Sequence, residues 1–102
     1  FLYTSGQIAL DPKSGIFLSG EIEDETEQTL KNISAILQAG GVNFENVIKT
    51  TVYMSDLNDF TRMNQIYEKY FSTNKPARAC VQVAALPKGA KLEIDAIAIC
   101  SS

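Results

Sequence analysis

The two segments nearest the C-terminus place the strongest constraint on the fold, because both predict strands that are apolar on more than one face. Residues 77–85 and 91–100 are rich in Val, Ile and Ala. A strand with one face in water alternates cleanly between apolar and polar residues, so this sheet needs cover on both faces. One face of residues 91–100 is wholly apolar, and the other mixes apolar residues with Lys91, Glu93 and Asp95. We place Arg78, Cys80 and Gln82 on the same mixed face.

Two other segments predict helices. Asp24 followed by Glu27 resembles a capping box, and apolar residues then recur at helical spacing as far as Gly40-Gly41. We expect a helix over residues 24–39. A second helix follows Asp56 or Asn58 as its cap. We interpret its apolar stripe as core packing; the stripe comprises Phe60, Met63, Tyr67, Tyr70 and Phe71.

The remaining segments complete an α+β fold. Residues 1–10 and 16–18 predict strands around a turn, and residues 47–54 predict another strand. The order is β-β-α-β-α-β-β, with both helices on one face of one sheet and a hairpin loop at residues 86–90. Residues 1–102 suit a single domain. No helix remains for the second sheet face, so we expect another subunit to cover it.

Composition excludes several functional classes. The sequence has no His, which argues against His-based acid–base chemistry, Cys–His or Ser–His nucleophiles and nearly all zinc sites. The net charge of −3 disfavours nucleic acid, and no apolar run approaches the ~20 residues of a membrane helix. Cys80 and Cys100 have no metal-ligand spacing and fit a reducing compartment. We expect a cytoplasmic protein, with the mitochondrion as the alternative.

Arg78 is the first candidate site residue. It stands at the start of a strand of small and apolar residues, and its planar fork suits a carboxylate. The alternative is a structural ion pair with Asp95 or Glu93. Cys80 follows two residues later on the same face. Without a His to activate it, we interpret Cys80 as a packing residue whose backbone could line a pocket shared with Arg78.

Glu93 and Asp95 are the second candidates, because a carboxylate on an apolar strand could act as a base toward water. The predicted hairpin sets Glu93 opposite Val83, which is five residues from Arg78, or roughly 16 Å along the strand. The two residues would then share a pocket only across a subunit boundary. The alternative role for Glu93 is a structural ion pair.

Two weaker candidates remain. Gly6, within Ser5-Gly6-Gln7, could allow close approach of the backbone to a ligand, or could mark a strand irregularity. Asn64 lies outside the apolar stripe of the second helix and could be solvated.

Three segments resemble the reactive intermediate deaminases, also called the YjgF type. The most specific is PARACVQVAALPKGAKLEIDAIA, from Pro76 to Ala98. YTSGQIALDPKSG (residues 3–15) and VIKTTVYMSDLNDF (residues 47–60) resemble two further blocks of that family, in the same order and spacing. The resemblance covers essentially the whole chain.

The resemblance implies a chorismate-mutase-like fold, a homotrimer with clefts between subunits, and hydrolysis of 2-imino acids to 2-keto acids and ammonia without metal or cofactor. It implies that Arg78 binds the substrate carboxylate, that Cys80 contributes backbone contacts and that Glu93 holds the water. Ser5 and Asn64 would line the cleft. The family's N-terminal segment, whose Tyr closes over the ligand, has no counterpart in this sequence.

Other functions remain open at this point. A non-catalytic module could bind 2-keto acids through the same arginine. An endoribonuclease or translation inhibitor is a further alternative, against which the acidic pI and the lack of His count. A chaperone-like role is also known in the family, and the sequence offers no test of it.

Overall fold

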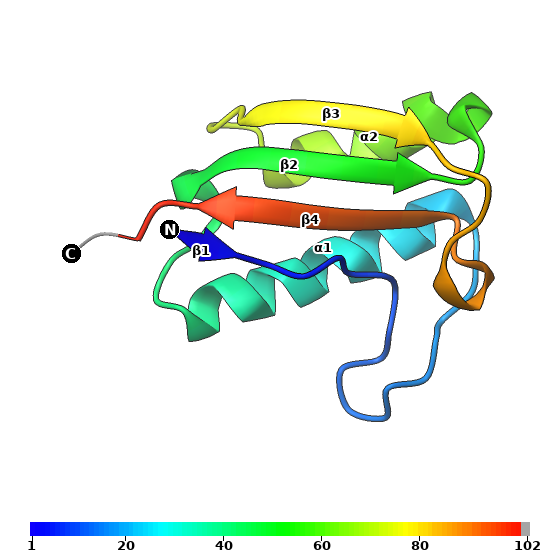
Figure 1. Cartoon of the computed structure of the whole chain (residues 1–102), viewed down its shortest axis with the longest axis horizontal. Helices are drawn as coiled ribbons and strands as arrows, with labels where there is room; N and C mark the ends of the chain where they lie inside the picture. Colours follow the sequence, from blue (N-terminus) through cyan, green and yellow to red (C-terminus); the bar gives the residue numbers. More distant parts are fainter. Residues whose placement is uncertain (101–102) are drawn as a thin grey trace.

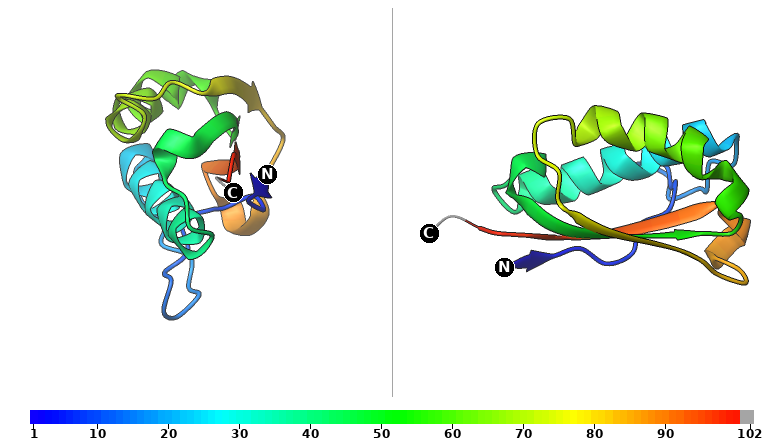
Figure 2. Two further views of the ribbon diagram at one scale, coloured as in Figure 1. Left: turned by 90° about the vertical axis from the view of Figure 1, so that its left-hand side faces the viewer. Right: turned by 90° about the horizontal axis from the view of Figure 1, so that it is seen from above.

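The computed structural model describes residues 1–100, in which a four-stranded sheet carries two helices on one face (Figures 1 and 2). The expected α+β class is confirmed. The elements are β1 (Leu2–Tyr3), α1 (Ile22–Ala39), β2 (Val47–Met54), α2 (Phe60–Tyr70), β3 (Ala77–Gln82) and β4 (Leu92–Ala98).

The sheet order is β1-β4-β2-β3, so the expected hairpin between the last two strands is wrong. β2 lies between them and pairs parallel with β3 and antiparallel with β4. Helix α2 returns the chain to the end of the sheet at which β2 begins, so β3 runs parallel to β2. The segment after β3 then passes around the end of β2. Val83 N–H donates to the Met54 carbonyl at 2.9 Å, and Ser55 N–H donates to the Lys91 carbonyl at 3.0 Å.

The N-terminal strands are shorter than expected. Beyond β1, the chain bonds to β4 at two places: Thr4 N–H donates to Ala96 O at 2.9 Å, and Gln7 N–H donates to Ile94 O at 2.8 Å and its carbonyl accepts from Ile94 N–H at 3.0 Å. Three steps along the N-terminal segment therefore oppose two steps of β4, which is a β-bulge at Ser5 and Gly6. The strand expected at residues 16–18 is reduced to one bridge between Leu10 and Phe17.

Helix α1 begins two residues before the expected start. Its capping box joins Glu21 and Asp24, not Asp24 and Glu27, because Glu21 N–H donates to Asp24 Oδ2 at 3.3 Å. The helix ends at Ala39 as expected. The cap before α2 is Asp56, whose Oδ1 accepts from Asn58 N–H at 2.9 Å and starts a short 3-10 turn that leads into the helix.

The core lies between the helices and one face of the sheet. Helix residues such as Leu30 and Met63 pack against strand residues such as Val52 and Ile94, and all four are fully buried. Most of the stripe on α2 is core, as interpreted from the sequence; its buried members are Met63, Tyr67 and Phe71.

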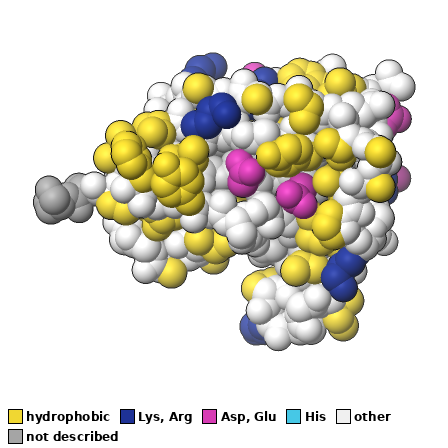
Figure 3. Space-filling model, in the orientation of Figure 1, with side chains coloured by type: hydrophobic (Ala, Val, Ile, Leu, Met, Phe, Trp, Pro, Cys, Tyr) yellow, Lys and Arg dark blue, Asp and Glu magenta, His cyan; other side chains and the backbone are white. Residues whose placement is uncertain are grey.

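The opposite sheet face is open to solvent in a single chain (Figure 3). Glu93 and Asp95 lie on it beside exposed apolar side chains, of which Tyr3 is 70% and Val81 44% exposed. Figure 3 shows acidic groups near the middle of this face with hydrophobic groups around them. The expected mixed face is therefore confirmed for β4. Within residues 1–100, neither helix is long and apolar enough to cross a membrane.

For β3 the expected face is wrong. Arg78 pairs with Thr50 and Cys80 pairs with Val52 in the parallel ladder, and these β2 partners are buried on the helix side. Paired residues share a face, so Arg78 and Cys80 lie on the helix side of the sheet, across it from Glu93. The error arose because the faces of β3 were matched to β4 as if the two were neighbours.

Candidate functional site

Arg78 is held at the edge of the sheet by side chains of α2. Its Nη1 donates a short hydrogen bond to Asn64 Oδ1. Its Cζ lies 4.7 Å from the centroid of the Tyr67 ring and 5.2 Å from that of Phe60, within cation–π range of both. One amide and two rings thus hold the guanidinium in place.

Asn64 and Tyr67, which contact Arg78, are oriented by further hydrogen bonds. Asn64 Nδ2 donates to Glu68 Oε1 at 2.9 Å, which turns the amide oxygen toward Arg78. Tyr67 Oη lies 2.7 Å from Thr50 Oγ1 in a buried hydrogen bond. Burial raises the pKa of Tyr67, partly offset by the Thr50 hydrogen bond and the charge of Arg78, so the phenol is neutral near pH 7.

The Arg78 guanidinium forms no ion pair with a carboxylate of residues 1–100. Among residues 1–100 the ion pairs within 4.0 Å involve Arg62 and Lys91, and Arg78 is in none of them. The structural ion pair with Asp95 or Glu93, considered from the sequence, is therefore absent. A hollow of about 270 Å³ opens beside the guanidinium; its lining comprises Tyr67, Glu68, Phe71, Lys75, Pro76 and Arg78.

Cys80 follows Arg78 on the helix side of β3, half-buried against the core. Burial raises the pKa of its thiol, and the charge of Arg78 only partly offsets this. The thiol is therefore protonated near pH 7, which disfavours a nucleophile and fits packing.

Glu93 lies on the open face beneath the N-terminal bulge. A Cβ added to Gly6 would overlap Glu93 Oε2, so the absence of a side chain lets the backbone cross the carboxylate. Gly6 thus marks a strand irregularity and lets the backbone approach Glu93 closely, while its approach to a ligand stays a prediction. Its neighbour Ser5 is exposed, and Ser5 Oγ accepts from Gln7 Nε2 at 3.0 Å.

Asp95 and Glu93 differ in their contacts. Tyr53 Oη donates to Asp95 Oδ2 at 3.4 Å, and the charge of Asp95 is the main reason that the pKa of Tyr53 is raised. Among residues 1–100 the Glu93 carboxylate has no side-chain hydrogen bond of this kind. Of the two acids, Glu93 is the one with no side-chain hydrogen bond to either carboxylate oxygen within residues 1–100.

The candidate residues form two separate groups in one chain. The Arg78 group comprises Arg78, Asn64 and Cys80, and the Glu93 group comprises Glu93, Ser5 and Gly6. Glu93 is opposite Tyr53, not Val83, while the row of Arg78 runs through Thr50 to Ala96. Ala96 and Glu93 are three residue steps apart on β4, which is about 10 Å along the strand, and the groups are on opposite faces. One chain therefore keeps them apart, although by a different geometry from that expected.

Comparison with known proteins decides the family. The family profile described as "Endoribonuclease L-PSP" matches residues 1–100. The chain belongs to this family. The resemblance to the YjgF type is confirmed as well, since the crystal structure of the YjgF gene product from E. coli superposes with a TM-score of 0.89 at 43% identity, over 95% of this chain and 78% of that one.

Similar relatives include proteins of known name. The chain is 55% identical to human 2-iminobutanoate/2-iminopropanoate deaminase over 96% of its own length and 72% of that protein. The rat protein of the same name is 54% identical over the same shares. TdcF from E. coli, solved with bound serine, has a TM-score of 0.90 and 43% identity, over 97% of this chain and 80% of that one.

The packing of Phe60 and Tyr67 against Arg78 was not predicted from the sequence. Phe60, Asn64 and Tyr67 are spaced i, i+4 and i+7, so they lie on one helix face. Asn64 had been placed outside the stripe, yet it lies at its edge. This spacing was the signal that could have assigned Asn64 and both rings to one function.

Proposed function

We propose that this chain hydrolyses small 2-imino acids, such as 2-iminopropanoate and 2-iminobutanoate, to 2-keto acids and ammonia. The observation that carries the proposal is Arg78, a forked cation that has no carboxylate partner among residues 1–100 and is held by Asn64 and two rings. Such a group is prepared for bidentate contact with a substrate carboxylate. Relatives at 50–55% identity that carry the name of this deaminase support the reaction.

The proposed mechanism needs only orientation and proton transfer. Arg78 binds the carboxylate and places C2 of the imine near a water held by Glu93. The water adds to C2 while Glu93 takes its proton, and the proton then passes to the nitrogen of the tetrahedral adduct. The C–N bond then breaks as the second proton of the added water, on the C2 hydroxyl, passes to the nitrogen, so that ammonia and the 2-keto acid leave. Positioned proton transfer of this kind contributes about 10²–10⁴-fold to the rate.

We further propose that the complete site forms between subunits of a homotrimer, with the Arg78 group from one subunit and the Glu93 group from the next. The separation of the two groups within one chain supports this arrangement. The exposed apolar side chains of the open sheet face support it too, because a surface of this kind is typical of a protein interface.

The test of the reaction is ammonia release from freshly generated 2-iminopropanoate, with and without the protein. We expect release to follow enzyme concentration and to saturate with substrate. A non-catalytic binding module would bind pyruvate in calorimetry yet leave the rate of ammonia release at that of buffer. That result would replace the deaminase by the second function considered.

The test of the shared site is complementation between two impaired variants, assayed at substrate concentrations well below KM. Arg78→Lys and Glu93→Gln chains are unfolded together and refolded as a mixture, with each variant refolded alone as the control. In a cyclic trimer, random mixing makes about a quarter of the sites from two intact halves, so activity should return to about a quarter of wild type. A site contained in one chain would recover nothing. Sedimentation equilibrium on the same samples gives the oligomeric state.

The family description also names an endoribonuclease. A chain with no His and a net charge of −3 has neither the usual acid–base residue nor an attraction for phosphate. We therefore expect no cleavage of single-stranded RNA at concentrations that deaminate 2-iminopropanoate.

A further inference from the structure

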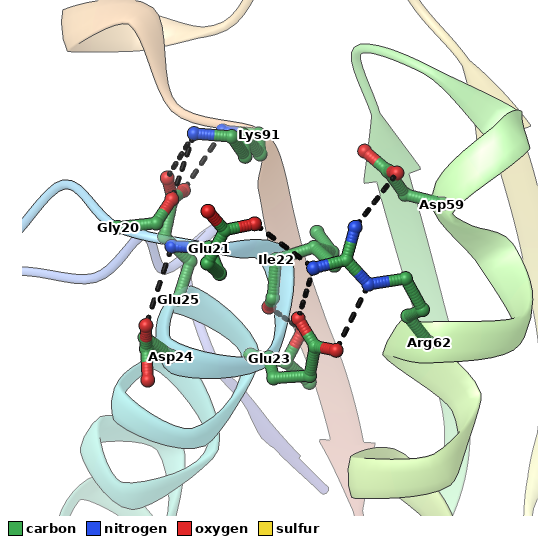
Figure 4. A network of polar contacts seen from close by, with 10 residues as sticks. Gly20, Glu21, Ile22, Glu23, Asp24, Glu25, Asp59, Arg62 and Lys91 are labelled. Atoms are coloured by element: carbon green, nitrogen blue, oxygen red, sulfur yellow. Dashed lines mark hydrogen bonds and ion pairs between the residues drawn. The ribbon is translucent and has the colours of Figure 1, made fainter.

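A buried carboxylate joins α1 to the start of β4 (Figure 4). Glu25, in the first turn of α1, is 0% exposed. Its Oε1 accepts a hydrogen bond from the Lys91 backbone N–H at 2.8 Å, and its Oε2 lies 3.4 Å from Lys91 Nζ. Lys91 Nζ also donates to the Gly20 carbonyl at 2.7 Å. We call these contacts the Glu25–Lys91 clamp.

The clamp fixes the point at which β4 begins. The Lys91 carbonyl accepts from Ser55 N–H at 3.0 Å, so both backbone polar groups of Lys91 are bonded, one to α1 and one to the end of β2. The loop just before it has a left-handed backbone at Lys88 (φ 58°) and Gly89 (φ 70°) and closes on itself through short-range hydrogen bonds. Hydrogen bonds at Lys91 therefore attach the chain to α1 and to the end of β2 before it enters β4.

Glu93 is two residues beyond the clamp, about 7 Å along the strand. Its carboxylate lies beneath Gly6 with no room for one further carbon atom. A small shift of the start of β4 would therefore change where the Glu93 oxygens lie. Displacing a reacting group by about 1 Å can reduce the rate by about 10²-fold.

An ion pair alone does not account for a buried carboxylate at this place. The N-terminal end of a helix favours an anion, yet an apolar side chain of similar size commonly serves a buried site as well as an ion pair does. What an apolar side chain lacks is an acceptor for the Lys91 N–H. Compared with an apolar side chain, the carboxylate adds the hydrogen bond that sets the backbone of Lys91.

A second ionic network at the same end of α1 gives the contrast (Figure 4). Arg62 Nη2 on α2 lies 2.9 Å from Glu21 Oε2 and 2.7 Å from Glu23 Oε1. These side chains are 36–73% exposed, and none of their bonds involves the backbone of β4. The Arg62 network therefore joins the helices without touching the strand that carries Glu93.

We propose that Glu25 is a positioning residue for the deamination, acting through Lys91 on the start of β4 and hence on Glu93. This rests on the proposed function, because the role of Glu93 belongs to it. In this proposal Glu25 affects catalysis although its buried side chain contacts neither the substrate nor the attacking water.

The test compares Glu25→Leu with Glu25→Gln. Leu has a similar volume but no acceptor, and we expect kcat to fall by about ten- to a hundredfold while pyruvate binding, which depends on Arg78, stays near wild type. Gln keeps an amide oxygen for the Lys91 N–H, so we expect it to retain most of the wild-type kcat. Rescue by Gln separates the hydrogen bond from the charge.

Two control variants separate position from stability. Arg62→Gln breaks the exposed network at the same helix turn and should leave kcat within about twofold, because exposed ion pairs contribute little. Ile33→Val loses one buried methyl group from the same helix, about two turns beyond Glu25 and outside the clamp. It should lower the melting temperature without a matching fall in kcat. If Glu25→Leu lost no more kcat than Ile33→Val, the proposal would be overturned.

Amide hydrogen exchange over residues 91–94 tests the clamp independently of catalytic activity. Faster exchange is expected in Glu25→Leu and near wild-type exchange in Glu25→Gln. If the wild-type protein released no ammonia, the proposed function would fail. Unchanged exchange in Glu25→Leu would instead overturn the clamp, whatever the activity.

Discussion

The two groups of the candidate site are held in different ways. Arg78 is oriented by other side chains, since Asn64, Phe60 and Tyr67 all reach it from α2. Glu93 is oriented by backbone, since the bulge at Gly6 crosses its carboxylate and β4 fixes its Cα. If several side chains orient a residue, removing them one at a time should lower activity in steps. If the backbone orients it, a single substitution in that backbone segment should lower activity sharply.

The two groups also differ in what they should do to kinetics. If the Arg78 group binds the carboxylate, its variants should weaken binding of substrate and of 2-keto acid alike. If the Glu93 group handles the water, its variants should lower kcat and leave binding of the 2-keto acid unchanged. Four substitutions can break or sharpen this contrast.

Glu93→Gln should have the largest effect. It preserves shape but removes the base, so kcat for 2-iminopropanoate should fall by about 10²–10⁴-fold. Pyruvate affinity, measured by calorimetry, should stay close to wild type. The control is Asp95→Asn on the same face of β4, whose carboxylate already has Tyr53 as a partner and which should retain most activity. A Glu93→Gln protein with wild-type turnover and a lower melting temperature would show instead that Glu93 is structural.

Arg78→Lys should act on binding. Lysine keeps the charge but loses the planar fork and the contacts of the guanidinium with two aromatic rings. Hydrogen bonds to charged groups contribute about 1.5–3 kcal/mol, so pyruvate affinity and kcat/KM should fall together by about 10- to 100-fold. The matched control is Arg62→Lys, which changes an arginine of α2 that faces Glu21 and Glu23. Near-full activity of Arg78→Lys would remove Arg78 from its role.

Gly6→Ala should lower kcat by about tenfold, because the new Cβ displaces the Glu93 carboxylate. The atom that it meets is the end of a flexible side chain, so the melting temperature should change little. A double-mutant cycle tests the cause, since Gly6→Ala should have no further effect on kcat in a Glu93→Gln background. An equal effect in both backgrounds would mean that Gly6 acts elsewhere.

Local patterns predicted the elements well, and pairing between distant segments did not follow from them. The span of β2 and the end of α1 came directly from β-branched residues and from Gly40-Gly41. The neighbour of β4 did not, because nothing within residues 77–100 shows that β2 lies between the last two strands. That error placed Arg78 on the wrong face.

The site was predicted in its residue types more than in its geometry. The fork of Arg78 and the carboxylate of Glu93 were recognisable from chemistry and from the family resemblance. The clamp was invisible, since Glu25 and Lys91 are 66 positions apart and neither has a motif of its own. Contacts of that range depend on the packing of α1 against β4, which the sequence alone does not specify.

Asn64→Ala should have the smallest effect and tests whether Arg78 is held by several contacts. Removing the amide leaves the guanidinium over Tyr67 and Phe60, so Arg78 keeps part of its orientation. A single hydrogen bond contributes about 0.5–1.5 kcal/mol net, which predicts a loss of about three- to tenfold in pyruvate affinity and kcat/KM. The control is Gln65→Ala, an exposed neighbour on the same helix, which should leave both at wild type. A loss as large as that of Arg78→Lys would mean that the amide alone orients the guanidinium. A fall in kcat with unchanged affinity would move Asn64 to the half of the site that handles water.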